Sequence, residues 1–141
     1  MIAVDTNILV YAHREELPLH RKALARLVEL AESPFPWGLP VFCIAEFLRV
    51  VTHPKLFDPP SAIEDGLAAI AGLVKSPSLA LLNPGAMYWN ILEEIIRQSR
   101  VKGNLLYDAQ IVAVCRENGV NDILSEDRDF SRFTGVNLHT L

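Results

Sequence analysis

The stretch Ile2-Ala3-Val4-Asp5-Thr6-Asn7 decides the fold of this chain, because an apolar run there leads directly into a carboxylate. A short apolar run predicts a buried strand. Asp5 then lies at the carboxyl end of that strand, the edge where open parallel α/β sheets bind their ligands. Asp5 is therefore the first candidate residue of a functional site, and its partners should follow later in the chain.

The rest of the chain alternates short apolar runs with helical patterns. Strands are predicted at residues 79–82, 122–124 and 136–139, and residues 39–43 form either a strand or the entry to a helix. Helices are predicted over residues 8–12, 19–33, 44–51, 61–75, 87–101 and 105–117. This alternation predicts an α/β fold with a parallel sheet covered by helices. No linker or repeat divides the chain, so we expect one domain over residues 1–141.

Local signals predict where several of these helices begin and end. Thr6 or Asn7 is suited to cap the first helix. The Pro-Phe-Pro-Trp-Gly segment at 34–38 predicts a turn or loop after the second helix. Residues 61–64, Ser-Ala-Ile-Glu, have the spacing of a capping box. Asn104 is a plausible cap for the helix that contains Asp108.

Composition restricts the function. Half of the 141 residues are hydrophobic and 21% are charged, which provides a core and excludes general disorder. The net charge of -4 excludes nucleic-acid binding by bulk charge, so RNA or DNA would require a local basic patch or bound metal ions. Cys43 and Cys115 are expected to be reduced core thiols of a cytoplasmic protein, with a disulfide between them as the alternative. We find no signal peptide and no apolar run that predicts a membrane span.

Four acids fall at the ends of predicted elements or in an apolar segment. Asp5 ends the first strand, Asp127 follows the strand at 122–124, and Asp108 lies in the first turn of a helix. Glu46 lies among apolar residues of another helix. Because strand carboxyl ends and helix amino ends meet at one edge of a parallel sheet, we expect all four acids to face one cleft.

If the four acids converge, their negative charges must be compensated. Two like charges about 4 Å apart repel by roughly 4 kcal/mol at an effective dielectric near 20. A few such pairs would rival the ~5–15 kcal/mol that stabilises a domain. Either the acids do not converge, or cations or protons neutralise them. Carboxylate oxygens suit Mg²⁺ or Mn²⁺, which serve phosphodiester hydrolysis by lowering the pKa of an attacking water and neutralising the leaving oxygen.

Each acid also has a simpler explanation on its own. Asp5 could cap a helix, Glu46 could lie on the surface, and the helix dipole favours an acid at Asp108. Asp127 and Asp129 could form Asx turns in a loop. The order of the acids and their places at element ends favour a shared site.

Polar and basic neighbours could support the acids. Thr6 and Asn7 could orient Asp5 or a water, although helix capping explains them equally well. Ser125 could hold a water at the metal or a phosphate, and Asp129 is assigned a supporting or structural role, paired with Arg128 or Arg132. A basic patch for an RNA backbone could come from Arg14, Arg21, Lys22, Arg26 and Arg49. A solvated helix face is the simpler explanation for any one of these five.

The ordered set resembles the PIN-domain nucleases and, within them, the VapC-type toxins of toxin–antitoxin modules. The segments that carry the resemblance are Val4-Asp5-Thr6-Asn7, Ala45-Glu46-Phe47, Tyr107-Asp108-Ala109-Gln110 and Leu124-Ser125-Glu126-Asp127-Arg128-Asp129-Phe130. They follow the family's order over nearly the whole chain. Ser125 stands where the family often has Thr. Glu126 stands where a small residue is common, which leaves open whether Glu126 or Asp129 also contributes to the metal site.

The resemblance has specific implications for fold and function. It implies a three-layer α/β/α sandwich with a central, mainly parallel sheet. It implies that Asp5, Glu46, Asp108 and Asp127 are the catalytic, metal-binding acids of a Mg²⁺- or Mn²⁺-dependent endoribonuclease. It also implies an RNA substrate, a homodimer and neutralisation by a cognate antitoxin.

Two other functions fit a similar scaffold. A phosphotransfer or phosphatase domain also uses an Asp at a strand end, but the haloacid-dehalogenase type needs a second Asp where this chain has Asn7. A receiver domain needs a Lys on a later strand, which we do not find with a matching Asp. A non-catalytic PIN-like binding module is disfavoured because all four acids are present.

Overall fold

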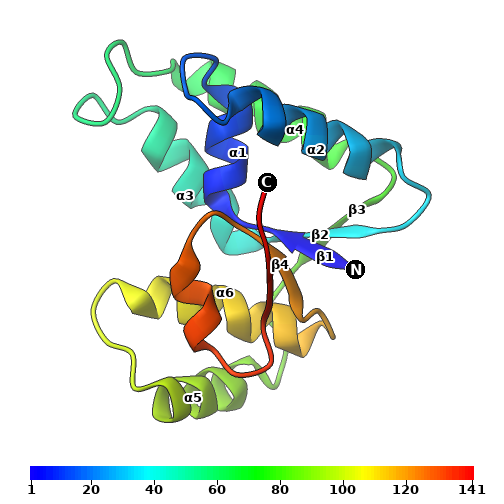
Figure 1. Ribbon diagram of the computed structural model, residues 1–141, viewed down its shortest axis with the longest axis vertical. Helices are drawn as coiled ribbons and strands as arrows, with labels where there is room; N and C mark the ends of the chain where they lie inside the picture. The colour runs from blue at the N-terminus through cyan, green and yellow to red at the C-terminus, as the bar shows by residue number, and fades with distance from the viewer.

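The computed structural model describes all 141 residues and contains a five-stranded sheet between two layers of helices (Figure 1). The strand order is β3-β2-β1-β4-β5, and every neighbouring pair is parallel. The strands are β1 (Ile2–Val4), β2 (Trp37–Pro40), β3 (Leu79–Leu82), β4 (Asp122–Leu124) and β5 (Asn137–His139). The predicted α/β/α sandwich with a parallel sheet is therefore confirmed.

Six α-helices and one 3₁₀ helix cover the sheet. They are α1 (Thr6–His13), α2 (His20–Glu32), α3 (Val41–Val51), α4 (Ile63–Val74), α5 (Tyr88–Ser99), α6 (Leu105–Glu117) and η1 (Arg128–Arg132). In Figure 1, α1 to α4 lie above the sheet, and α5 and α6 lie below it. None of these helices has the length and apolar character required to cross a membrane.

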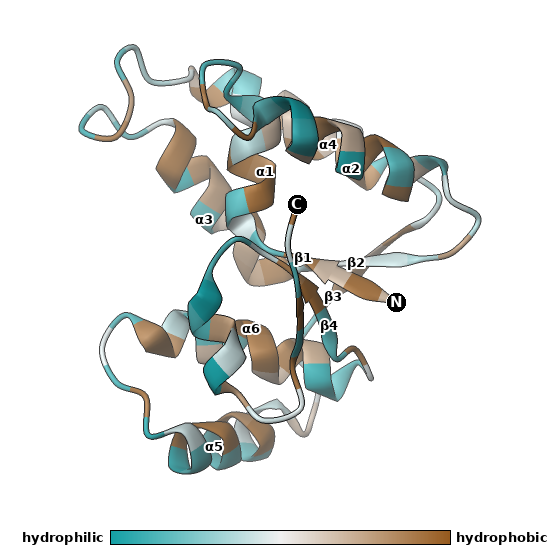
Figure 2. Cartoon of the chain, in the orientation of Figure 1, coloured by the Kyte–Doolittle hydropathy of each residue, from teal (hydrophilic) through white to brown (hydrophobic).

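Burial follows the hydrophobic pattern of the sequence. Figure 2 shows mostly hydrophobic residues in β1 and α3, whereas hydrophilic residues are frequent in α2. Residues 111–115 of α6 are all buried, because α6 packs against both α5 and the sheet. Cys43 and Cys115 are buried and form no disulfide, so the prediction of core thiols is confirmed and the disulfide alternative is wrong.

The connections between strands create a switch point beside β1. The chain builds β1, β2 and β3 in one direction and then returns to place β4 and β5 on the other side of β1. Val4 pairs with Leu124, and the backbone N–H of Asp5 donates to the carbonyl oxygen of Leu124 at 3.0 Å. In open α/β sheets the ligand crevice opens at this point, outside the carboxyl ends of the strands.

The segment predicted as a turn at 34–38 is partly a strand. Trp37 and Gly38 belong to β2, which pairs with β1 on one side and β3 on the other. These tertiary pairings override the local preference of Pro and Gly for a turn. Gly38 also leaves room for its neighbour, since a Cβ atom there would lie 2.8 Å from Cδ1 of Leu82.

The predicted cap of α1 is wrong, because Asp5 takes that position. Its carboxylate accepts a hydrogen bond from the backbone N–H of Thr6 at 2.7 Å. The side chains of Thr6 and Asn7 are turned away to Glu46 and Ser125.

The predicted capping box at 61–64 is also wrong. Helix α4 follows Ala62, which has no side chain able to cap it, and the hydroxyl of Ser61 instead contacts His13 and Arg14. Asn104 precedes α6 as predicted, but its side chain makes no capping hydrogen bond. At α4, the distant contacts of Ser61 therefore take precedence over the local capping signal.

Candidate active site

The four predicted acids line one cleft at the switch point. The cleft contains about 250 Å³ of open space. A water molecule occupies roughly 30 Å³, so a hydrated cation and a phosphate group fit together. The lining residues are Asp5, Thr6, Asn7, Val10, Tyr11, Glu46, Val50, Asp108 and Asp127.

Asp5 is held at the bottom of this cleft by two hydrogen-bond donors. Its side chain follows β1 and is only 6% exposed. Oδ1 accepts from the backbone N–H of Thr6, and Oδ2 accepts from the hydroxyl of Ser125, both at 2.7 Å. Burial raises the pKa of Asp5 to about 6, although these two hydrogen bonds oppose the rise. The carboxylate is thus oriented by the fold and costly to leave charged.

Ser125 joins the acids that follow β1 and β4. Its hydroxyl donates to Asp5 and accepts from the side-chain amide of Asn7 at 2.9 Å and from the backbone N–H of Asp127 at 3.0 Å. The Ser125 side chain is fully buried. Ser125 therefore orients protein groups, which the sequence alone did not indicate.

Glu46 enters the cleft from α3. Its Oε2 accepts a hydrogen bond from the hydroxyl of Thr6 at 2.7 Å, and its Oε1 lies 4.0 Å from Nη2 of Arg49. Thr6 thus binds Asp5 through its backbone and Glu46 through its side chain. One residue sets the positions of two acids.

Asp108 faces the cleft from the first turn of α6, where no protein donor contacts its carboxylate. Asp108, Asp127 and Asp129 each offer one carboxylate oxygen, and these three oxygens lie within 4.8 Å of one another. Burial raises the pKa of Asp108 to about 7, and repulsion from Asp127 and Asp5 adds to the rise. A proton or a bound cation would therefore stabilise this half-buried carboxylate.

Asp129 is closer to the site than the sequence suggested. It belongs to the same group of three carboxylates, and its backbone N–H donates to Oδ1 of Asp127 at 2.8 Å. The signal that could have identified it is the two-residue spacing of Asp127 and Asp129 at the start of a helical turn.

The apolar lining was also missed. Val10 and Tyr11 lie three and four residues after Asn7 on α1, and Val50 lies four residues after Glu46 on α3. Helical spacing from the predicted polar residues would have indicated all three.

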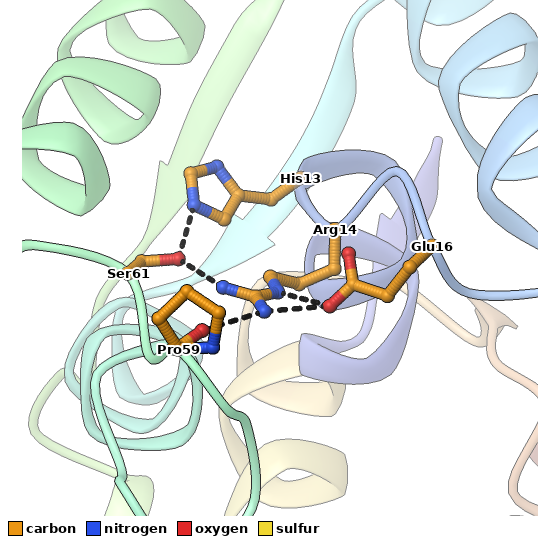
Figure 3. A network of polar contacts seen from close by, with 5 residues as sticks. All are labelled: His13, Arg14, Glu16, Pro59 and Ser61. Carbon is orange, nitrogen blue, oxygen red and sulfur yellow. Dashed lines mark hydrogen bonds and ion pairs between the residues drawn. The ribbon is translucent and has the colours of Figure 1, made fainter.

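Arg14 is not part of a basic patch. Its side chain is 12% exposed and donates to Glu16, to the hydroxyl of Ser61 and to the carbonyl oxygen of Pro59 (Figure 3). Its guanidinium also lies 4.4 Å from the centre of the Phe57 ring. Arg14 therefore ties the segment after α3 to the end of α1 and is unavailable to a ligand.

The donor set fits a hard divalent cation. All candidate ligands are carboxylate oxygens, the ligand type that Mg²⁺ and Mn²⁺ prefer. Burial, with a smaller contribution from repulsion between the acids, raises the pKa of Asp5 and Asp108, and such perturbed groups in a cleft indicate a candidate functional site.

Comparison with known proteins agrees with this geometry. The PIN domain matches residues 2–136 of the chain. The chain belongs to the PIN-domain family. This PIN domain is 37% identical to a VapC ribonuclease of Mycobacterium bovis over 133 residues. The aligned region covers 94% of this chain and 90% of the relative. It is 31% identical over 134 residues to ribonuclease VapC48 of Mycobacterium tuberculosis, covering 95% and 92%. Within the family, the chain therefore belongs with the VapC-type proteins.

Solved structures share the fold of this PIN domain. VapBC2 from Rickettsia felis, bound to a promoter DNA fragment, superposes with a TM-score of 0.70 at 18% identity and covers 100% of this chain and 99% of that one. Mycobacterium tuberculosis VapC20, a sarcin–ricin loop cleaving toxin, gives 0.68 at 21% identity, with coverage of 96% and 98%. At these identities the likeness shows the fold alone. The match to the PIN domain and the identity to the VapC relatives confirm the predicted resemblance to VapC-type PIN domains.

Proposed function

We propose that the protein is a divalent-metal-dependent endoribonuclease and the toxin of a toxin–antitoxin pair. Asp5, Glu46, Asp108 and Asp127 hold Mg²⁺ or Mn²⁺ in this proposal. The observation that carries it is the convergence of these acids, from distant parts of the chain, in one cleft at the switch point of the sheet. Asp129 is a further candidate ligand because it groups with Asp108 and Asp127.

The protein's own contribution is a site whose geometry is set before the substrate arrives. Ser125 fixes Asp5 and the segment that carries Asp127, and Thr6 fixes Glu46. When bound, a divalent cation such as Mg²⁺ or Mn²⁺ would lower the pKa of the attacking water and neutralise charge on the leaving oxygen. Because burial raises the pKa of Asp5 and Asp108, binding of a cation should release protons.

Substrate and partners follow from the relatives and the charge of the chain. The matching relatives carry the name ribonuclease, and several fold neighbours are toxin–antitoxin complexes. We assign this chain an RNA substrate, a cognate antitoxin, a homodimeric state and a cytoplasmic location, with residues 1–141 as one domain. The net charge of -4 means that metal ions and local arginines hold the RNA.

The direct test is RNA cleavage by the purified protein. We expect cleavage with Mg²⁺ or Mn²⁺, loss of activity in EDTA, and recovery when the metal is returned. Asp5→Asn should be inactive yet retain the wild-type circular dichroism spectrum. Wild-type cleavage in EDTA or by Asp5→Asn would refute the proposed site.

Two further measurements test the partners. Size-exclusion chromatography with light scattering should give the mass of a dimer. The product of an adjacent small reading frame should co-purify with the protein and inhibit cleavage. A monomer, or an adjacent product that neither binds nor inhibits, would contradict the respective assignment.

A further inference from the structure

An arginine lies at each end of the group of acids. Arg49 comes one helical turn after Glu46 on α3, with Nη2 4.0 Å from Oε1 of Glu46 and a side chain 62% exposed. Arg132 ends η1, with Nη2 3.2 Å from Oδ1 of Asp129 and a side chain 50% exposed. Each arginine side chain therefore contacts an acid at the border of the cleft and remains exposed to solvent.

The acids between these two arginines form one connected row. On the α3 side, Glu46 is bound to the hydroxyl of Thr6, whose backbone N–H is bound to Asp5, both at 2.7 Å. The row thus leads from Arg49 to the buried acid that follows β1.

The second half of the row continues through β4. Asp5 is bound to Ser125 at 2.7 Å, and the hydroxyl of Ser125 is bound to the backbone N–H of Asp127 at 3.0 Å. Asp127 is bound to the backbone N–H of Asp129 at 2.8 Å, and Asp129 contacts Arg132. The two guanidinium groups therefore stand at opposite ends of a continuous network.

Both guanidinium groups make long contacts with their acids. Arg49 has the longest contact among the arginine–carboxylate pairs of the structure, and Arg132 has the second longest. By contrast, the exposed pair of Arg97 and Glu93 on α5 closes to 2.9 Å. A cation bound by the acids would compete for Glu46 and Asp129, which would leave the N–H donors of both arginines free for another anion.

We propose that Arg49 and Arg132 bind the RNA phosphates on either side of the scissile phosphate, so that the strand crosses the row of acids from α3 to η1. This inference rests on the proposed ribonuclease function. A guanidinium binds phosphate with two parallel hydrogen bonds, which fixes position as well as adding affinity. Because phosphate contacts carry no sequence information, the pair sets the register of the strand and leaves base preference to other residues.

The first experiment removes one charge at a time. Arg49→Gln and Arg132→Gln are compared with Arg97→Gln, which loses an exposed, ion-paired arginine of α5. On a single-stranded RNA oligonucleotide with one mapped cleavage site, the first two variants should raise KM about tenfold with little change in kcat. The salt dependence of log(kcat/KM) should become shallower by about 0.7 for each lost contact. Arg97→Gln should match the wild type.

Two binding measurements separate the arginines from the metal site. In an Asp108→Asn background, fluorescence anisotropy should show the same tenfold weakening of RNA binding by each substitution. Calorimetry should show that Mn²⁺ binds Arg49→Gln and Arg132→Gln no more weakly than the wild type, because the acids are intact. Loss of Mn²⁺ binding in either variant would overturn the proposal.

The second experiment assigns each arginine to a side of the cleavage site. A neutral methylphosphonate replaces the phosphate on the 5′ side or the 3′ side of the scissile linkage. Each replacement should abolish the effect of one arginine substitution and leave the effect of the other. Arg49→Gln and Arg132→Gln variants that behave like Arg97→Gln, or that respond to the same linkage, would refute the proposal. Failure of the wild type to cleave unmodified RNA would instead refute the ribonuclease function.

Discussion

Asp5 and Asp108 face the same cleft but are held in opposite ways. Asp5 is buried and accepts hydrogen bonds from Thr6 and Ser125, whereas Asp108 is half-buried and has no donor. Burial is the largest cause of the raised pKa of both acids, yet the less buried Asp108 has the higher value, about 7 against about 6. The fold itself therefore completes the β1 side of the site. The α6 side depends on a cation or a proton.

The largest expected effect comes from removing the charge at Asp108. Asp108→Asn should reduce RNA cleavage about a thousandfold, because it weakens one of the proposed metal ligands. In EDTA at pH 8 the same variant should have a higher Tm than the wild type, since repulsion falls and no hydrogen bond is lost.

Asp5→Ala provides the contrast. It should lose cleavage to the same extent but lower the Tm, because it removes the α1 cap, which costs about 1 kcal/mol, and the partner of a buried hydroxyl. Cleavage rates and thermal unfolding followed by circular dichroism measure both effects. Tm shifts of the same sign in the two variants would break the distinction between the two acids.

A smaller effect is expected from Ser125, which gives Asp5 its fixed orientation. Ser125→Ala should weaken Mn²⁺ binding about 10- to 100-fold, because it deletes the hydroxyl that orients Asp5 and contacts the Asp127 backbone. Ser99→Ala, which removes a hydroxyl bonded to Ile95 on α5, is the matched control. Calorimetric titration with Mn²⁺ should separate the two, and equal affinities would show that the β1 side needs no such support.

The smallest expected effect is a shift in Tm with pH for the cation-free protein. The folded-state pKa of Asp108 lies above its ordinary value, so its protonation stabilises the fold fully below about pH 4. That contribution is lost as the pH rises through about 7. The loss begins at about pH 4, where the unfolded chain starts to ionise. In EDTA, wild type and Asp108→Asn should therefore have similar Tm values near pH 4, and the wild type should fall below the variant by a few degrees at pH 8.

Saturating Mn²⁺ is the control for this titration. It should restore the wild-type Tm at pH 8 and leave Asp108→Asn with a smaller gain, because the cation replaces the proton only where the ligand set is complete. A constant difference between the two proteins from pH 5 to 8 in EDTA would contradict the raised pKa.

The sequence determined the class of fold and the places of the acids along it. Apolar runs at residues 2–4, 79–82 and 122–124 are strands because their local pattern and tertiary pairing agree. The first-turn position of Asp108 and the strand-end position of Asp5 follow from the same local signals. The order of the acids was also sufficient to predict the PIN-domain family.

How these side chains are held depends on contacts between elements that are far apart in the sequence. Asp5 and Ser125 are 120 residues apart, and no local pattern indicates that one hydroxyl orients two acids. Pairing with β3 places Trp37 in a strand, and contacts with distant residues leave the Arg14 side chain only 12% exposed. Local periodicity reports which face of an element is apolar, whereas distances, burial and pKa values arise only when elements far apart in the sequence come into contact.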